Sequence, residues 1–529
     1  MNLKTDSVVP TPKKAAHKAT QKHLRGSTLL LAGRVIAMAT NFAVQVFIVR
    51  YLSKSEYGAF AYAMSLISLG SSLVVFGLDK TITRFLPIYQ EKGEKSKLTG
   101  TILMVVATIL GMGMLLVLAV YALQGWLGNA IVDDPQAVRL LVLMVLLVPI
   151  QALDSLLVGM LAIFAKPSAI FFRRHVLGPG LKLLVVLLLM FLGYNVYFLA
   201  TGYVAAGALG VAIYTGVLIR DLSRQDLWKY FNPRKATYPV REIFGFTAPL
   251  FTTNIVYVIR SQLVIVLLGY FQTTRDVASF RAVQPVADLN TMVIQSFGLL
   301  FMPTIARLFA KEDHDGINDL YWQSAIWITI ITFPIFLATF ALAGPLTVFL
   351  FGQRYAQSGL IMALLAFGYF FNAALGFNAD TLRVYGRLRY TVFIDFVAML
   401  ISVALSLILI PRYGSVGAAF ATCGTLVLYN TLNHIGLKFA TRIQLFRLRF
   451  LQVYTSVALG TFLLYAFQKL VSASIYLDVA VAALISLIVL VINRDFLQVE
   501  HTFPELLRFP IVRFLFETRP NKAGLPNEE

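Results

Sequence analysis

The chain has 529 residues, of which 58% are hydrophobic and only 13% are charged, and its mean hydropathy is +0.75. This composition excludes a soluble globular protein and predicts one that crosses a membrane many times. The net charge of +19 would suit a nucleic-acid-binding protein, but the placement of the charges, described below, indicates a different cause. The single cysteine, Cys423, excludes an intramolecular disulfide and any metal site built from several cysteines.

Residues 1–26 are polar and basic, which predicts a disordered cytoplasmic tail. They contain no apolar core followed by a cleavage site, so we expect no removable signal peptide. The rest of the chain is a succession of apolar stretches, many of them near the length of about 20 residues that a helix needs to cross a bilayer. We expect fourteen transmembrane helices, at 27–49, 58–78, 99–125, 138–165, 176–193, 196–219, 243–269, 277–299, 320–344, 356–377, 388–410, 415–437, 450–468 and 475–493.

A weak internal repeat divides these helices into two halves. A shift of 220 residues aligns EYGAF at 56–60 with DVASF at 276–280, and Pro87 then aligns with Pro303 after a gap of four residues. Two similar six-helix halves are a common transporter plan, in which the substrate binds between them. We therefore predict an all-α integral membrane protein with two pseudo-symmetric six-helix bundles, arranged as parallel repeats around a central cavity, and two C-terminal helices.

The predicted domains follow from this repeat. They are a cytoplasmic basic tail (1–26), an N-terminal six-helix bundle (27–219), a cytoplasmic linker (220–242), a C-terminal six-helix bundle (243–437), two extra transmembrane helices (438–493) and a cytoplasmic tail (494–529). Within the last tail, residues 504–516 are apolar with two arginines, which favours a helix lying in the membrane interface.

The lysines and arginines indicate the orientation. With the N-terminus inside, the cytoplasmic segments and the adjoining span ends hold 34 of the 45 basic residues, and the opposite side holds 7. This split fits the positive-inside rule for a multi-pass protein of the cytoplasmic membrane with both termini in the cytoplasm. It also explains the basic composition without a nucleic acid partner.

One predicted helix, 277–299, combines a membrane-spanning length with a polar face. Its polar side chains are spaced three and four residues apart and share one stripe: Arg281, Gln284, Asp288, Thr291 and Gln295. Lipid would make this stripe costly, so we expect it to face a water-filled cavity. The alternative is a polar seam between two packed helices.

Few ionisable residues lie inside the predicted spans, and each is a functional candidate. They are Arg34, Lys182, Arg260, Arg281, Asp154, Asp288 and Asp395. The four basic residues lie at successive depths and predict a ladder that binds a diphosphate, for which the arginine fork is well suited. The alternative for Arg34, Lys182 and Arg281 is that their side chains reach back to the membrane surface.

The other predicted roles follow from position. Asn41 and Gln45 continue the helical face of Arg34, so we include them with Gln284 among the substrate-binding residues. Asp288 either pairs with an arginine or binds a coupling proton or Na⁺, and Lys182 is either structural or part of coupling. Asp154 and Asp395 lie near the cytoplasmic third of their spans, where we expect basic loop residues to pair with them. We predict no cofactor and no metal site.

Three segments resemble polysaccharide flippases of the multidrug, oligosaccharidyl-lipid and polysaccharide exporter superfamily. They are IPRYGSVGAAFAT at 410–422, YGRLR at 385–389 and EYGAFAYA at 56–63, and the likeness extends over about residues 25–493. The resemblance implies transport of an undecaprenyl-diphosphate-linked oligosaccharide, such as an O-antigen or exopolysaccharide unit, across the inner membrane by alternating access. Membrane lipid, the lipid-linked glycan, and the glycosyltransferases and polymerase of the same pathway would be its partners.

The resemblance also leaves alternatives. Lipid II flippases place essential arginines in their first and eighth helices, which Arg34 and Arg281 would match, but the arginine of their second helix has no counterpart here. A multidrug or cation antiporter of the same superfamily would present carboxylates to its substrate, and the family's acidic residue of the seventh helix is replaced here by Arg260 and its neighbours. An enzyme is disfavoured because no predicted periplasmic loop exceeds about 13 residues and no ATP-binding or metalloprotease motif occurs.

Overall fold

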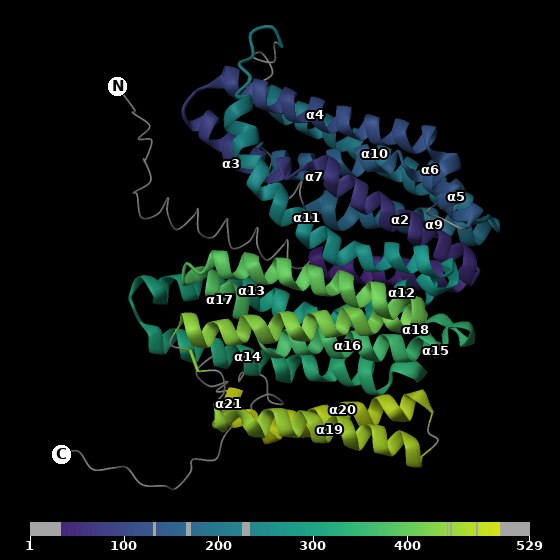
Figure 1. Ribbon diagram of the computed structural model, residues 1–529, viewed down its shortest axis with the longest axis vertical. Coiled ribbons are helices and arrows are strands. Elements are labelled where there is room, and N and C mark those ends of the chain that lie inside the picture. The colour runs from purple at the N-terminus through teal and green to yellow at the C-terminus, as the bar shows by residue number, and fades with distance from the viewer. Residues whose placement is uncertain are drawn as a thin grey trace, which may run out of the picture. The chain divides into compact units, whose positions relative to one another are not determined.

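This computed structural model describes residues 33–130, 134–164, 171–224, 233–441, 443–444, 447–471 and 474–497. All regular elements in these ranges are helices, which confirms the predicted all-helical membrane class (Figure 1). Ten of the described helices are long and apolar enough to cross a membrane, or eleven if a bent pair at Thr274–Gly298 and Leu300–Ala310 forms one span. The predicted number of fourteen spans therefore remains a prediction.

The described residues form two compact units, one ending at Val258 and the other beginning at Ile259. This division falls within helix α11 (Val240–Phe271). In the first unit α7 is central, because it packs against α2, α3, α4 and α10. The helices before α11 are Gly33–Tyr51, α2 (Lys54–Val75), α3 (Leu78–Glu91), α4 (Lys95–Ala122), α5 (Gln124–Ala130), α6 (Pro135–Met144), α7 (Leu147–Phe164), η1 (Phe172–Leu177), α9 (Gly178–Leu192) and α10 (Val196–Arg224).

In the second unit α16 is the central helix, packing against α12, α14, α15 and α18. The α19 and α20 helices pack against each other and against α14. The elements after α11 are α12 (Thr274–Ala287), η3 (Asp288–Thr291), α13 (Met292–Ala310), α14 (His314–Phe336), η4 (Leu337–Ala341), α15 (Ala343–Phe351), η5 (Gln353–Tyr355), α16 (Ser358–Ala374), α17 (Asn378–Val384), α18 (Leu388–Ala440), η6 (Leu448–Phe450), α19 (Leu451–Leu470), α20 (Ile475–Ile492) and α21 (Arg494–Leu497).

Helix α18 covers two predicted spans, 388–410 and 415–437, without a loop between them. A sharp corner separates them at Gly414, whose φ of 55° and ψ of −134° are not helical. Neighbouring polar groups fasten the corner, because Gln272 Nε2 donates to the carbonyl oxygen of Ile410 at 3.1 Å and Ser415 Oγ donates to Asp276 Oδ1 at 3.2 Å. Gly414 has a positive φ and lies close to the Asp276 carboxylate, and both conditions favour glycine because it has no Cβ.

In the first unit, the chain just before α11 is attached to the start of α4. Ser96 Oγ donates to the carbonyl oxygen of Lys235 at 2.7 Å, and the Thr237 amide donates to the Ser96 carbonyl at 3.2 Å. The approach is close because Gly100 lacks a side chain at the point of contact. A methyl group built there would overlap the Thr237 carbonyl oxygen.

Gly100→Ala should therefore detach residues 235–238 from α4 and make them sensitive to protease. Alanine inside a helix is normally favoured over glycine by about 1 kcal/mol. Any loss of stability in Gly100→Ala would therefore come from the clash with Thr237 and not from a weaker helix. Gly111→Ala in the same helix is the matched control, since a methyl group there meets nothing within 4 Å. Equal cleavage rates for the two variants in membranes would contradict this role of Gly100.

Candidate anion-binding cavity

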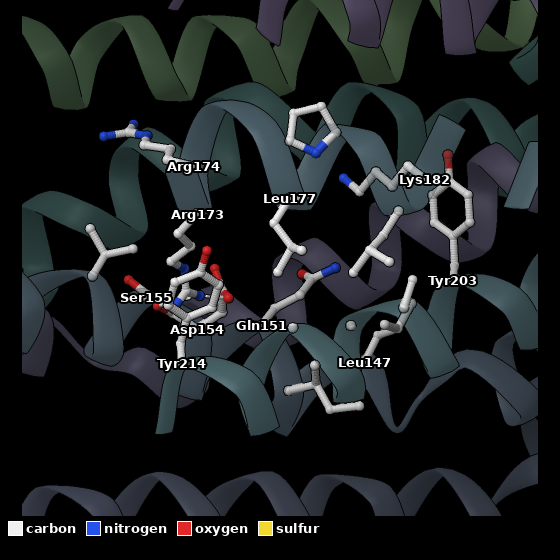
Figure 2. Close-up of a pocket in the computed structure, with 18 of the residues that line it drawn as sticks. Leu147, Gln151, Asp154, Ser155, Arg173, Arg174, Leu177, Lys182, Tyr203 and Tyr214 are labelled. Carbon is white, nitrogen blue, oxygen red and sulfur yellow. Dashed lines mark hydrogen bonds and ion pairs between the residues drawn. The ribbon is translucent and has the colours of Figure 1, made fainter. Parts of the chain in front are cut away.

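The first unit contains a cavity of about 630 Å³, within the range typical of small-molecule sites. Its walls come mainly from α7, from η1 with α9, and from α10 (Figure 2). The first helix, α2 and α3 add a few residues. All of the lining residues belong to the first unit, so the site can be described within this unit alone.

Helix α7 presents a mixed face to the cavity. Its lining residues include two adjacent pairs and a fifth residue, each about one helical turn further along, which places them on one side of the helix: Ile150 and Gln151, Asp154 and Ser155, and Val158. Helix α10 opposes them with small residues at Ala206, Gly207 and Gly210. A methyl group built at Gly210 would meet nothing within 4 Å, whereas one at Gly207 would come within 3.0 Å of the Ile150 side chain of α7. Gly210 thus leaves open space, and Gly207 allows α10 to approach α7 closely.

The turn η1 contributes two arginines. It is π-helical, and the Gly178 amide donates to the Arg173 carbonyl oxygen five residues earlier. Such turns insert an extra residue into a helix and are frequent at functional sites. Here the turn runs directly into α9, so Arg173 and Arg174 are continuous with a helix that also carries Lys182.

Arg173 forms an ion pair within the cavity wall. Its guanidinium is ion-paired with the Asp154 carboxylate and lies 4.4 Å from the centroid of the Tyr214 ring. The arginine side chain is 5% exposed, whereas the Asp154 side chain is 49% exposed. The prediction that Asp154 pairs with a basic residue of the next predicted loop is thus confirmed, as is that for Asp395, which Arg383 approaches at 4.0 Å.

The cavity as a whole is basic. Lys80, Arg173, Arg174 and Lys182 line it, against Asp79 and Asp154. Of the four basic residues, all but Arg173 are exposed in the structure. Lys182 Nζ lies 5.7 Å from the centre of the Tyr203 ring, at the opposite end of the cavity from Arg173 (Figure 2). An excess of cationic groups at this place favours an anionic ligand over a cation.

The structure brings together some of the predicted site residues of the first unit. Asn41 and Lys182 line the cavity. Gln45 Nε2 donates a hydrogen bond to the hydroxyl of Tyr57. Arg34 is half-buried in the first helix and is not among the residues lining the cavity. The roles predicted for these residues stay predictions.

In the second unit the predicted polar stripe is anchored by Arg281. Its Nη1 donates to Gln284 Oε1 at 3.0 Å and its Nη2 to Gln262 Oε1 at 3.3 Å. Gln284 Nε2 in turn lies 3.5 Å from the hydroxyl of Tyr369. Two amide oxygens from different helices therefore hold the arginine fork in one orientation.

Asp288 and Arg260 are the two remaining predicted site residues, and the structure describes the side chain of Asp288 only. Asp288 begins the short η3 turn, is exposed, and accepts a hydrogen bond of 3.1 Å from the Thr291 hydroxyl. The Arg260 side chain lies outside the described residues. Arg173 and Arg174 were not among the predicted site residues, because they fall in the predicted loop between spans 138–165 and 176–193. The signal that pointed to them was Asp154, a carboxylate in an apolar span that needed a partner.

Solved structures of two transporter types share this fold. The lipid II flippase MurJ, in an inward closed conformation, matches with a TM-score of 0.69 at 13% identity, over 89% of this chain and 100% of that chain. An inward-facing multidrug resistance transporter of the MATE family matches with a TM-score of 0.61 at 13% identity, over 76% of this chain and 93% of that one. The fold thus defines the class as a multi-pass, all-helical membrane protein built like these transporters.

Residues 47–360 match the family model described as polysaccharide biosynthesis protein, and because this is more than half of the chain, the chain belongs to that family. A succinoglycan biosynthesis transport protein of Rhizobium meliloti is 23% identical over 61% of this chain and 62% of its own length. A capsular polysaccharide biosynthesis protein of Staphylococcus aureus is 24% identical over 37% of this chain and 51% of its own. An uncharacterised membrane protein of Methanocaldococcus jannaschii is 20% identical over 76% of this chain and 81% of its own length. The predicted resemblance is confirmed at this level.

Proposed function

We propose that this protein moves an undecaprenyl-diphosphate-linked oligosaccharide across the cytoplasmic membrane by alternating access. The observation that carries the proposal is the net basic cavity, in which four cationic side chains face two carboxylates. A diphosphate cannot enter the hydrocarbon without a large desolvation cost, which cationic hydrogen-bond donors offset. The family of the chain and its relative in succinoglycan transport support a glycan as the rest of the cargo.

Complementation tests this proposal. A strain lacking its own flippase should regain surface glycan when it expresses this chain, and its accumulated lipid-linked precursor should fall. Both quantities are measured in the same cells, so that a block in synthesis is told apart from a block in transport. We propose that the protein acts together with the glycosyltransferases and the polymerase of the same pathway, and restored surface glycan would be consistent with these partners. If precursor stays high and surface glycan absent for several related glycans, the proposal fails.

The proposed topology places both termini in the cytoplasm, on the basis of the 34 to 7 distribution of basic residues. On a background without Cys423, single cysteines in segment 126–137 should react with a membrane-impermeant thiol reagent in intact cells. Cysteines in the 226–236 segment should react only after the cells are opened. Labelling of the second segment in intact cells would overturn the topology and, with it, the predicted linker at 220–242.

We also propose that Arg281 and Arg260 bind the diphosphate and that Asp288 is structural rather than coupling. Arg281→Ala should lower export about tenfold or more, because it removes a charged group whose hydrogen bond to a phosphate is worth about 1.5–3 kcal/mol. Arg281→Lys should retain part of the export, since it keeps the charge but cannot span the Gln262 and Gln284 oxygens. Arg275→Ala, at an exposed arginine of the same helix, is the matched control. A folded Arg260→Ala, Arg281→Ala double variant that exports at the parental rate would rule this pair out.

A further inference from the structure

The Arg173–Asp154 pair has features that a purely structural ion pair does not need. Arg173 is buried with one donor unsatisfied, because its Nη1 has no hydrogen-bond partner among the described residues. Its ion-pair partner is half exposed at the wall of a cavity that holds three further basic residues. Leaving a charged donor unsatisfied in a buried position is costly, so such a group calls for an explanation.

Two contacts besides the Asp154 carboxylate hold the arginine in the cavity wall. Its guanidinium lies against the face of Tyr214 at 4.4 Å, and its Nη2 also approaches the backbone oxygen of Asp154 at 3.4 Å. Neither contact depends on the carboxylate. Figure 2 shows Asp154, Arg173 and Tyr214 grouped at one end of the cavity. The carboxylate is the exposed member of the pair, so we expect it, rather than the buried guanidinium, to be the member that moves.

We infer that Arg173 is a phosphate-binding residue and that the Asp154 carboxylate occupies its place until the ligand arrives. A phosphate entering from the cavity exchanges with the carboxylate and gains the guanidinium fork, including the unsatisfied Nη1. One anion replaces another on the same cation, so the net gain is small and the binding readily reversible, which suits a site that must release its cargo. The inference rests on the proposed function only for the identity of the natural anion.

The exchange is tested by the thermal unfolding of the full chain in nanodiscs of neutral lipid, titrated with inorganic pyrophosphate. Asp154→Asn should unfold at a lower temperature than the parent without anion, because it leaves a buried arginine without its carboxylate. Pyrophosphate should raise the unfolding temperature of Asp154→Asn at a concentration about tenfold lower than the concentration that raises the unfolding temperature of the parent. Asp395→Asn, which removes the carboxylate near Arg383 in the second unit, is the matched control and should respond as the parent does.

A double-variant cycle separates exchange from a general change in cavity charge. If the carboxylate competes with pyrophosphate for Arg173, Asp154→Asn should lower the pyrophosphate concentration needed for stabilisation only when Arg173 is present, and not in the Arg173→Gln background. An equal gain in both backgrounds would overturn the inference, as would a parental response in Asp154→Asn alone. If Asp154→Asn is not recovered folded, Arg173→Lys replaces it and should bind pyrophosphate at least about tenfold more weakly; unchanged binding would overturn the inference.

The source of the phosphate is resolved by changing the lipid. Nanodiscs containing undecaprenyl diphosphate should stabilise Asp154→Asn, whereas the same fraction of phosphatidylglycerol should not. Stabilisation by both lipids would support the exchange but assign it to lipid phosphates in general.

The export assay tells this inference apart from the proposed function. If the double-variant cycle shows coupling between Asp154 and Arg173 but the chain exports no glycan, the exchange is supported and the proposed function is wrong. If the chain exports glycan but the cycle shows no coupling, the proposed function is supported and the exchange is wrong.

Discussion

Neutralising Arg174 and Lys182 together, as Arg174→Gln with Lys182→Gln, should nearly abolish glycan export while the protein stays folded in the membrane. Both side chains are exposed and line the cavity, one from η1 and the other from α9. Each charge-assisted hydrogen bond to a phosphate contributes about 1.5 kcal/mol or more, so losing two should slow export about 100-fold. Surface glycan and lipid-linked precursor are the measurements.

The matched control for this pair is Arg307→Gln with Lys469→Gln. These are also one exposed arginine and one exposed lysine, but neither lines the cavity. The control variant should export at close to the parental rate. That result would show that a general loss of surface charge does not cause the loss of export in the cavity variant. Export within about twofold of the parent by the cavity variant would mean that the basic groups do not bind the cargo.

The second large effect should come from Gly417→Ala, at the corner of α18. A methyl group at this buried glycine would overlap the backbone carbonyl of Leu409 on the other side of the corner. Backbone cannot move aside as a flexible side chain can, so we expect a loss of about 3 kcal/mol or more in the free energy of unfolding. The measurements are the amount of protein in the membrane and its unfolding temperature after purification.

Gly424→Ala is the control in the same helix. The nearest atom to an added methyl group there is a Leu405 side-chain carbon at 3.5 Å, an ordinary contact. This variant should match the parent or exceed it slightly, because alanine favours helix by about 1 kcal/mol over glycine. If Gly417→Ala is as stable as Gly424→Ala, the corner is not held by the close approach seen in the structure.

The helices were predictable because apolar stretches of membrane-spanning length leave few alternatives. The corner of α18 was only partly predictable. Pro411, Gly414 and Gly417 are typical of a break between two spans, but they do not indicate that helix continues directly on both sides of Gly414. The continuation depends on contacts with Gln272 and Asp276, which are distant in sequence.

The site was predictable where a charge interrupts an apolar stretch, as at Lys182. Arg173 and Arg174 carry the same chemistry but sit in a segment that also contains Lys166 and His175, which is typical of a cytoplasmic loop. Only the π-helical turn shows that they continue into α9. The small residues of α10 gave no signal at all, because alanine and glycine are common throughout membrane helices.

Translocation in reconstituted vesicles tests the central claim most directly. The purified chain is placed in liposomes with a fluorescent undecaprenyl-diphosphate-linked sugar, and the fraction that a membrane-impermeant quencher reaches is followed over time. We expect the parental chain to expose the inner-leaflet pool much faster than either empty liposomes or the Arg174→Gln, Lys182→Gln variant. If the parental chain is no faster than empty liposomes, the proposed function is wrong.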